Sequence, residues 1–212
     1  MRRLAIIDID GTINDFNKVD NEIISSIYGK NKIIKVLDRL LWKINSLDII
    51  TNQFIIFKAR IYLYSLINRT KYRNDMELYK EEYVRKSKLY FQQFMDNEYT
   101  VLKKSGIEVM LLTCDPFDGF CENNVTVVQN KWQYIRDNAY NKYGKLYVVG
   151  NNYMDDISSG LKLRSKMSVC DDVQIYYVGN SKILKKLLAK KSVQICSNLK
   201  EVVNNISKRD IS

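Results

Sequence analysis

Five short apolar runs, separated by stretches with helical character, constrain the fold of this chain more than any other feature. The runs cover residues 4–9, 109–113, 146–149, 174–178 and 193–196. Each has the length of a buried strand, and several end at glycine or polar turn residues. Helical patterns lie near most of them, at 131–140, 181–190 and 198–206. Short strands alternating with helices predict an α/β fold whose parallel sheet is covered by helices on both faces.

The segment between the first two runs has a different pattern. Two sets of apolar residues recur there with helical spacing, Ile33, Ile34, Leu37, Leu40, Leu41 and Ile44 in the first and Met76, Tyr79, Tyr83, Tyr90 and Phe94 in the second. No alternation of strand and turn interrupts them. We therefore expect a core domain of residues 1–16 and 99–212, with a helical domain of residues 17–98 inserted after the first strand.

Composition places the chain among globular proteins and leaves its partners open. Of 212 residues, 46% are apolar and 27% are charged, and the formal net charge is +10. A basic surface favours anionic partners, which include phosphorylated metabolites, nucleic acid and an acidic membrane face. Abundant Lys, Asn and Ile are equally typical of an AT-rich genome, so the charge does not select among these partners.

The four cysteines do not have the spacing of a metal site. They are Cys114, Cys121, Cys170 and Cys196, no two of them are separated by only two residues, and the chain has no histidine. A zinc site is therefore not expected, and we interpret the cysteines as reduced thiols. Asp8 and Asp10 interrupt the apolar N-terminus too early for a signal peptide, which predicts a cytoplasmic protein.

Two carboxylates follow the first apolar run, in the segment Asp8-Ile9-Asp10-Gly11-Thr12. Ligands of open α/β sheets bind at the carboxyl ends of the strands. Paired carboxylates there can hold a hard cation such as Mg²⁺, and a shielded carboxylate can attack phosphorus while its neighbour moves the proton. The Gly11 amide is expected to face the phosphate. The alternatives are an acidic surface turn or the start of a calcium loop, but the later ligands of an EF-hand are absent from the sequence.

Three further signals follow in order along the chain. Thr113 ends the second apolar run, Lys131 begins an expected helix, and the polar segment 150–156 follows the third run. A hydroxyl and an ammonium group at this sheet edge would bind phosphate, and side-chain oxygens would complete a metal site. Each signal alone is weak, because such residues are common in unrelated proteins.

Taken together, these four motifs resemble the pattern of the haloacid dehalogenase superfamily of hydrolases. The resemblance covers roughly residues 1–16 and 99–206, and it implies a Rossmann-like fold, Mg²⁺ and phosphoryl transfer to water. It implies that Asp8 is the nucleophile and Asp10 the general acid/base. The residues expected to bind phosphate are Gly11, Thr12, Thr113 and Lys131, and those expected to hold the metal are Asp8, Asp10, Asn151, Asp155 and Asp156.

The chain departs from this family pattern at Asn151, where the family has an acid. An amide oxygen can bind a metal but brings no charge, which predicts weaker Mg²⁺ binding unless Asp155 compensates. The helical insertion occupies the place of the family's type 1 cap, which closes over small substrates. Its length, basic charge and aromatic content resemble the phosphoserine-phosphatase-like branch and its lipid-phosphate relatives.

The apolar region 49–67 has two interpretations. Lys58 and Arg60 lie near its middle, which argues against a membrane-spanning helix. We expect it to belong to the interior of the insertion, and the alternative is an interfacial helix that contacts an anionic membrane. The tyrosines and basic residues between 72 and 90 could stack on nucleic-acid bases, but a solvated helix face explains them equally, so nucleic acid is not the expected partner.

The sequence thus predicts a capped α/β phosphatase that acts on a phosphorylated small molecule, a phosphate monoester. Two alternatives remain. A non-catalytic protein of the same fold would hold an anionic partner, which the amide at Asn151 favours. A phosphomutase would share Asp8 and Asp10 and differ in the group that accepts the phosphoryl.

Overall fold

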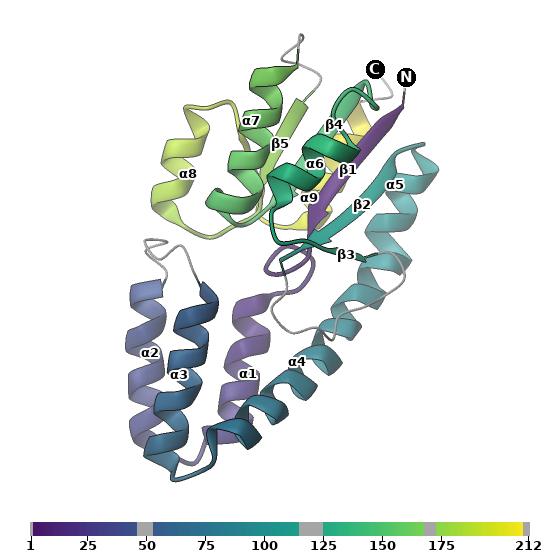
Figure 1. Cartoon of the computed structure of the whole chain (residues 1–212). Coiled ribbons are helices and arrows are strands. Elements are labelled where there is room, and N and C mark those ends of the chain that lie inside the picture. Colours follow the sequence, from purple (N-terminus) through teal and green to yellow (C-terminus); the bar gives the residue numbers. More distant parts are fainter. Residues whose placement is uncertain (1, 46–52, 115–124, 168–172, 210–212) are drawn as a thin grey trace. The chain divides into compact units, whose positions relative to one another are not determined.

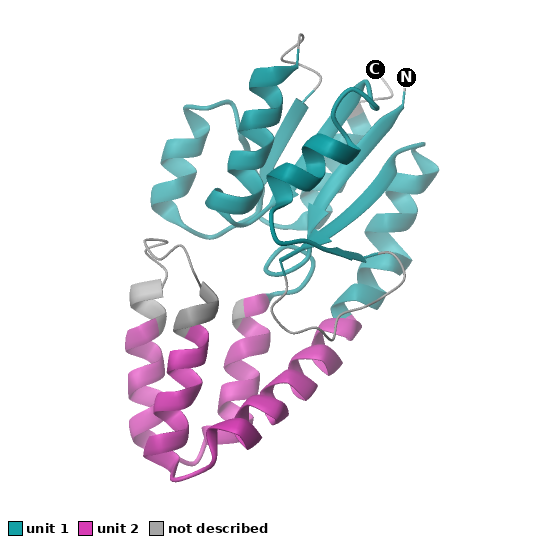
Figure 2. Ribbon diagram, viewed as in Figure 1, with its two compact units in different colours: residues 1–15, 90–212 teal, residues 16–89 magenta. Residues whose placement is uncertain are grey.

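The computed structural model describes residues 2–45, 53–114, 125–167 and 173–209. The chain divides into two compact units (Figure 2), of which unit 1 comprises residues 1–15 and 90–212 and unit 2 comprises residues 16–89. The second boundary falls at 89/90 rather than at the expected 98/99. It falls earlier because Phe91 and Phe94, at the end of helix α4 (Tyr72–Phe94), are buried in the core of unit 1.

Unit 1 is built on a parallel sheet of six strands in the order β3-β2-β1-β4-β5-β6 (Figure 1). The strands are β1 (Arg3–Asp8), β2 (Glu108–Thr113), β3 (Val125–Val127), β4 (Lys145–Gly150), β5 (Val173–Tyr177) and β6 (Gln194–Ile195). Asp8 pairs with Leu112 of β2, and Ile7 pairs with Val149 of β4. The carboxyl ends of β1, β2 and β4 therefore meet at one edge of the sheet.

Helices cover both faces of this sheet, as predicted (Figure 1). Alternate side chains of a strand point to opposite faces. Ala5 and Ile7 pack with residues of the end of α4, α5 (Thr100–Lys104) and α9 (Leu199–Arg209), and a π-helical turn, η1 (Met95–Tyr99), joins α4 to α5. Leu4 and Ile6 pack with residues of α6 (Lys131–Asn138), α7 (Ser158–Lys166) and α8 (Lys182–Ala189). The predicted α/β, Rossmann-like fold is thereby confirmed.

Unit 2 is helical and follows the first strand, which confirms the predicted insertion. It consists of α1 (Phe16–Tyr28), α2 (Lys32–Asn45), α3 (Gln53–Asn68) and most of α4. Its interior contains an ionic cluster in which Arg60 of α3 donates to both oxygens of Asp20 at 2.6 Å. Asp20 also accepts from Tyr79 at 2.6 Å, and the Arg60 Nε lies 3.5 Å from Asp38. These side chains link α1, α2, α3 and α4.

The region 49–67 is α-helical over its described part, 53–67, while residues 49–52 lie outside the described residues. No helix in the described ranges is both long and apolar enough to cross a membrane. Cys114 and Cys196 are free thiols, and Cys121 and Cys170 lie outside the described residues.

Candidate active site

The first motif forms a tight turn at the carboxyl end of β1. The Ile9 carbonyl accepts hydrogen bonds from the backbone amides of Thr12, Ile13 and Asn14, at 3.2, 2.9 and 3.2 Å. Gly11 has φ +82°, a left-handed conformation that glycine adopts without strain. The turn keeps both Asp8 and Asp10 at the edge of the sheet, within reach of the other motifs.

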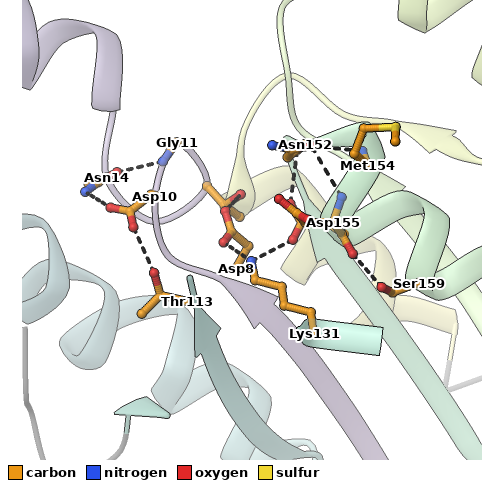
Figure 3. Close-up of polar contacts among 12 residues, drawn as sticks. Asp8, Asp10, Gly11, Asn14, Thr113, Lys131, Asn152, Met154, Asp155 and Ser159 are labelled. Atoms are coloured by element: carbon orange, nitrogen blue, oxygen red, sulfur yellow. Dashed lines mark hydrogen bonds and ion pairs between the residues drawn. The ribbon is translucent and has the colours of Figure 1, made fainter. Parts of the chain in front are cut away.

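Lys131 connects the first motif to the last (Figure 3). It is the first residue of α6, which Asn130 caps by accepting from the Gln133 amide. The Lys131 Nζ donates to Asp8 Oδ1 and, at 2.7 Å, to Asp156 Oδ1. All three side chains are buried, with exposed fractions of 6%, 6% and 2% for Lys131, Asp8 and Asp156. Three separate elements thus place two carboxylates around one ammonium group.

The charges of this buried trio do not balance. Burial and the nearby carboxylate of Asp156 raise the pKa of Asp8 to about 8, although the ammonium group of Lys131 opposes both effects. Burial lowers the pKa of Lys131, but the carboxylates of Asp156 and Asp8 outweigh it, so the net shift of the Lys131 pKa is upward. With Lys131 charged, full ionisation of both acids leaves an excess negative charge. A cation, or a proton on Asp8, would relieve it.

Asp10 is held by two neutral donors (Figure 3). Thr113 Oγ1 donates to Asp10 Oδ2 at 2.9 Å, and Asn14 Nδ2 donates to Asp10 Oδ1 at 3.1 Å. The Asn14 Oδ1 accepts from the Gly11 amide at 2.7 Å, so this amide is directed to Asn14 and not to an outer ligand. Sequence reasoning missed Asn14, although an Asn closing a turn four residues after Asp10 is a recognisable signal.

The fourth motif, residues 150–156, runs from the end of β4 into a π-helical turn, η2 (Tyr153–Ile157), that leads directly into α7. Asn152 caps the turn, because its Oδ1 accepts from the amides of Met154 at 2.8 Å and Asp155 at 3.4 Å. The Asn152 amide in turn donates to Asp156 Oδ2 at 3.0 Å. This turn buries Asp156 and leaves Asp155 exposed. Partial desolvation by the surrounding protein and the charge of Asp156 raise the pKa of Asp155.

Two glycines allow the motifs to approach each other closely. A Cβ on Gly150 would lie 2.3 Å from the Asp156 carboxylate. A Cβ on Gly11 would lie 1.9 Å from the Asn151 Nδ2, so the Asn151 side chain packs against the first motif. Both distances are far below van der Waals contact. Neither glycine can therefore be replaced without moving a candidate site residue.

The structure brings most of the expected site residues to one sheet edge, where they contact one another. The expected phosphate donors contact carboxylates, since Thr12 Oγ1 donates to Asp8 Oδ2 at 3.1 Å, Thr113 to Asp10 and Lys131 to Asp8 and Asp156. Within the described ranges, no three acidic or cysteine side chains are grouped closely enough to hold a metal ion. The five expected metal residues thus do not form one ligand cluster.

Comparison with known proteins gives no match: no protein-family model, no curated protein and no solved structure matches this chain. The residues of the sheet edge and their geometry are consequently the basis for assigning a function to this chain. A fold of this class hosts many chemistries, so the fold alone selects none of them.

Proposed function

We propose that this chain is a phosphohydrolase that cleaves phosphate monoesters through an aspartyl-phosphate on Asp8. The observation that supports this most strongly is the contact of Lys131 with both Asp8 and Asp156 at the carboxyl ends of β1 and β4. The four motifs are far apart in the sequence, and a chance set of polar residues would not be expected to meet at one edge. The resemblance of these motifs to the haloacid dehalogenase superfamily points to the same chemistry.

Each side chain has a defined part in the proposed reaction. A carboxylate oxygen of Asp8 bonds to phosphorus while the bond from phosphorus to the leaving oxygen breaks. Asp10 gives a proton to that oxygen and then takes one from the water that releases phosphate from Asp8. Lys131 offsets negative charge that builds up around phosphorus. Thr113 and Asn14 keep the Asp10 carboxylate in position for both proton transfers.

Magnesium fits the chemistry of the site. The candidate donors are carboxylate and amide oxygens, which hard divalent cations prefer, and the buried trio has one negative charge in excess when both of its acids are ionised. Asp8 and Asp156 would hold the ion, with Asn151 as a neutral donor. The bound ion would neutralise charge between the phosphate and the carboxylates. Without it, the excess negative charge at Asp8 and Asp156 would repel an incoming phosphate.

Asn151 supports a second candidate function, a non-catalytic protein that binds an anionic partner. This residue packs against Gly11, where the family pattern would place an acid. A phosphomutase would use the same Asp8 and Asp10 and is distinguished by its acceptor. The site gives no reason to prefer it to hydrolysis.

A phosphate-release assay separates hydrolysis from binding alone. Wild type and Asp8→Asn are incubated with Mg²⁺ and with sugar, amino-acid, nucleotide and lipid phosphates. We expect release from at least one class by the wild type and loss of nearly all of it in Asp8→Asn. Absence of turnover in every class, together with tight binding of one of the compounds, would favour the binding protein.

A further inference from the structure

One end of unit 2 is strongly basic. The turn between α1 and α2 and the turn between α3 and α4 form this end, which we call the basic tip. Segments 29–33 and 66–74 contain five basic residues and no acidic residue, namely Lys30, Lys32, Arg69, Lys71 and Arg73. All five side chains are exposed. The two short segments thus carry a formal charge of +5, of which Arg73 is paired with the exposed Glu77 of α4 at 3.2 Å.

A buried carboxylate joins the two turns. Asp75, in the first turn of α4, accepts from Tyr28 at the end of α1 at 2.7 Å. It also accepts from Ser65 of α3 at 2.8 Å and from Thr70 at 2.5 Å. Asp75 is only 3% exposed, so its charge is enclosed by these hydroxyl groups. The basic residues of both turns therefore belong to one continuous end of the unit.

Exposed apolar side chains lie beside the basic tip. Ile33 of α2 is 63% exposed, and Leu66 of α3 is 58% exposed. Ile33 begins an apolar stripe on α2 that continues with Val36 and Leu40. Leu66 ends an apolar stripe on α3 that begins with Tyr62 and Leu63. These four further side chains are between 40% and 57% exposed. The exposed charged side chains of α2 in its described part, Lys32, Lys35 and Arg39, are all basic.

Helix α3 is apolar on two opposite sides. Phe57, Ile61 and Tyr64 are buried in unit 2, whereas Leu63 and Leu66 are exposed. A helix that is apolar all round is normally buried on every side. Its outward stripe is therefore the type of surface that a partner covers.

We propose that the basic tip and the two apolar stripes form a peripheral docking surface for an anionic membrane. Lysine and arginine next to exposed aliphatic side chains suit a lipid interface, where the charges meet acidic headgroups and the aliphatic groups enter the acyl boundary. Nucleic acid fits less well, because every residue of the two stripes except Tyr62 is aliphatic and cannot stack on bases. A second copy of the chain also fits less well, because two basic tips repel each other.

The test is sedimentation of the full chain with vesicles of phosphatidylcholine alone or mixed with an equal part of phosphatidylserine. We expect binding to the mixed vesicles, release by salt, and little binding to phosphatidylcholine. Replacing three tip lysines, in Lys30→Gln/Lys32→Gln/Lys71→Gln, should weaken the partition constant about 100-fold, since each basic residue near an anionic surface contributes about five-fold. The variant Ile33→Ser/Leu66→Ser should weaken the partition constant independently of the lysine changes. It should fold, because both positions are exposed.

Helix α8 provides the matched control, because it also exposes Ile183 and Leu187 among lysines. The triple change Lys182→Gln/Lys186→Gln/Lys190→Gln removes the same charge from unit 1. Equal weakening by the α8 and tip triples would contradict the proposal, since binding would then follow net charge alone. So would absence of binding to the mixed vesicles.

Two further outcomes would replace the membrane with another partner. In the first, the tip triple lowers binding to single-stranded DNA but leaves vesicle binding unchanged. In the second, the wild type sediments as a dimer that Ile33→Ser/Leu66→Ser dissociates. Neither result bears on the site of Asp8, so this proposal and the proposed function can fail separately.

Discussion

The Asn14 Nδ2 donates to Asp10 Oδ1 at 3.1 Å, and the Asn14 Oδ1 accepts from the backbone amide of Gly11. Asn14 is 2% exposed and therefore holds this turn from inside the protein. In the proposed reaction it is a positioning residue, because it acts through Asp10 and not on the substrate itself.

Replacing Asn14 should lower the rate constant more than it changes substrate binding. Asn14→Ala removes a donor that orients Asp10, so we expect kcat to fall about 10- to 100-fold, a part of the 10²–10⁴ that a general acid/base contributes. KM should stay within a few-fold. Thr12→Ser retains the hydroxyl that contacts Asp8 and serves as the control. If Asn14→Ala lowered both the free energy of unfolding and kcat but left the pH profile of kcat unchanged, Asn14 would have only a structural role.

Without divalent cations, stability should depend on pH through Asp8. Burial and Asp156 raise the pKa of Asp8 from an ordinary value near 4 to about 8. A carboxyl with a raised pKa stabilises the folded state below its unfolded pKa, and this contribution is lost as pH rises through the folded pKa. The free energy of unfolding should therefore fall between about pH 4 and pH 8, by up to about 1.4 kcal/mol per unit of pKa elevation.

Urea unfolding in EDTA across this pH range measures the effect, with Asp8→Asn as the comparison. The variant should lose most of the pH dependence and should be at least as stable as the wild type at pH 8. A wild type whose stability rises from pH 5 to pH 8 in parallel with the variant would mean that Asp8 is ionised at little cost.

Lys131 should matter for folding as well as for activity. Lys131→Met would leave Asp8 and Asp156 buried beside each other without their common cation. Breaking a buried ion pair by removing one partner costs about 3–5 kcal/mol. Adding Asp156→Asn to Lys131→Met should restore a large part of the lost free energy of unfolding, because a neutral amide then replaces one of the two carboxylates. Urea unfolding of both variants gives the values, and a double variant no more stable than Lys131→Met would contradict the charge argument.

Asn151→Asp should strengthen binding of Mg²⁺. The change adds a negative charge beside Gly11 and the first motif, and a close charge pair near a protein surface is worth on the order of 1 kcal/mol or more, so affinity should improve about five-fold. Calorimetric titration of both proteins with MgCl₂ measures it, and phosphate release reports whether activity follows. Unchanged affinity would indicate that Asp155 or Asp156 already supplies the charge, or that residue 151 does not face the ion.

The sequence predicts the fold correctly where apolar residues determine it. The five apolar runs correspond to β1, β2, β4, β5 and β6. Strand β3 was missed because it has only three residues, none of them buried. Helix α7 was missed because its sequence, SSGLKLRSK, has few apolar residues and no clear stripe. The apolar residues expected to line one side of a helix do lie on a helix, α2. Ile33 and Leu40 are nevertheless exposed, because Ile34 and the ion-paired Asp38 occupy the inner side of that helix.

The sequence identifies candidate site residues where a residue type has one obvious chemical use. The sequence singled out Asp8, Lys131 and Asp156, and the structure brings them into contact. Asn14 and Asn152 were not singled out, because asparagine in a turn has many uses and only the folded geometry connects it to a carboxylate. The direction of the Gly11 amide was likewise beyond sequence reasoning, since it depends on Asn14.

Chemical trapping of the intermediate tests the central claim most directly. The protein is mixed with Mg²⁺ and the best substrate from the phosphate-release assay, quenched during turnover and treated with borohydride, which reduces an aspartyl-phosphate to homoserine. The proposed mechanism predicts homoserine at position 8 by peptide mass spectrometry, dependent on substrate and absent from Asp8→Asn. Steady phosphate release with an unmodified Asp8, or an Asp8→Asn variant that still turns over, would contradict it.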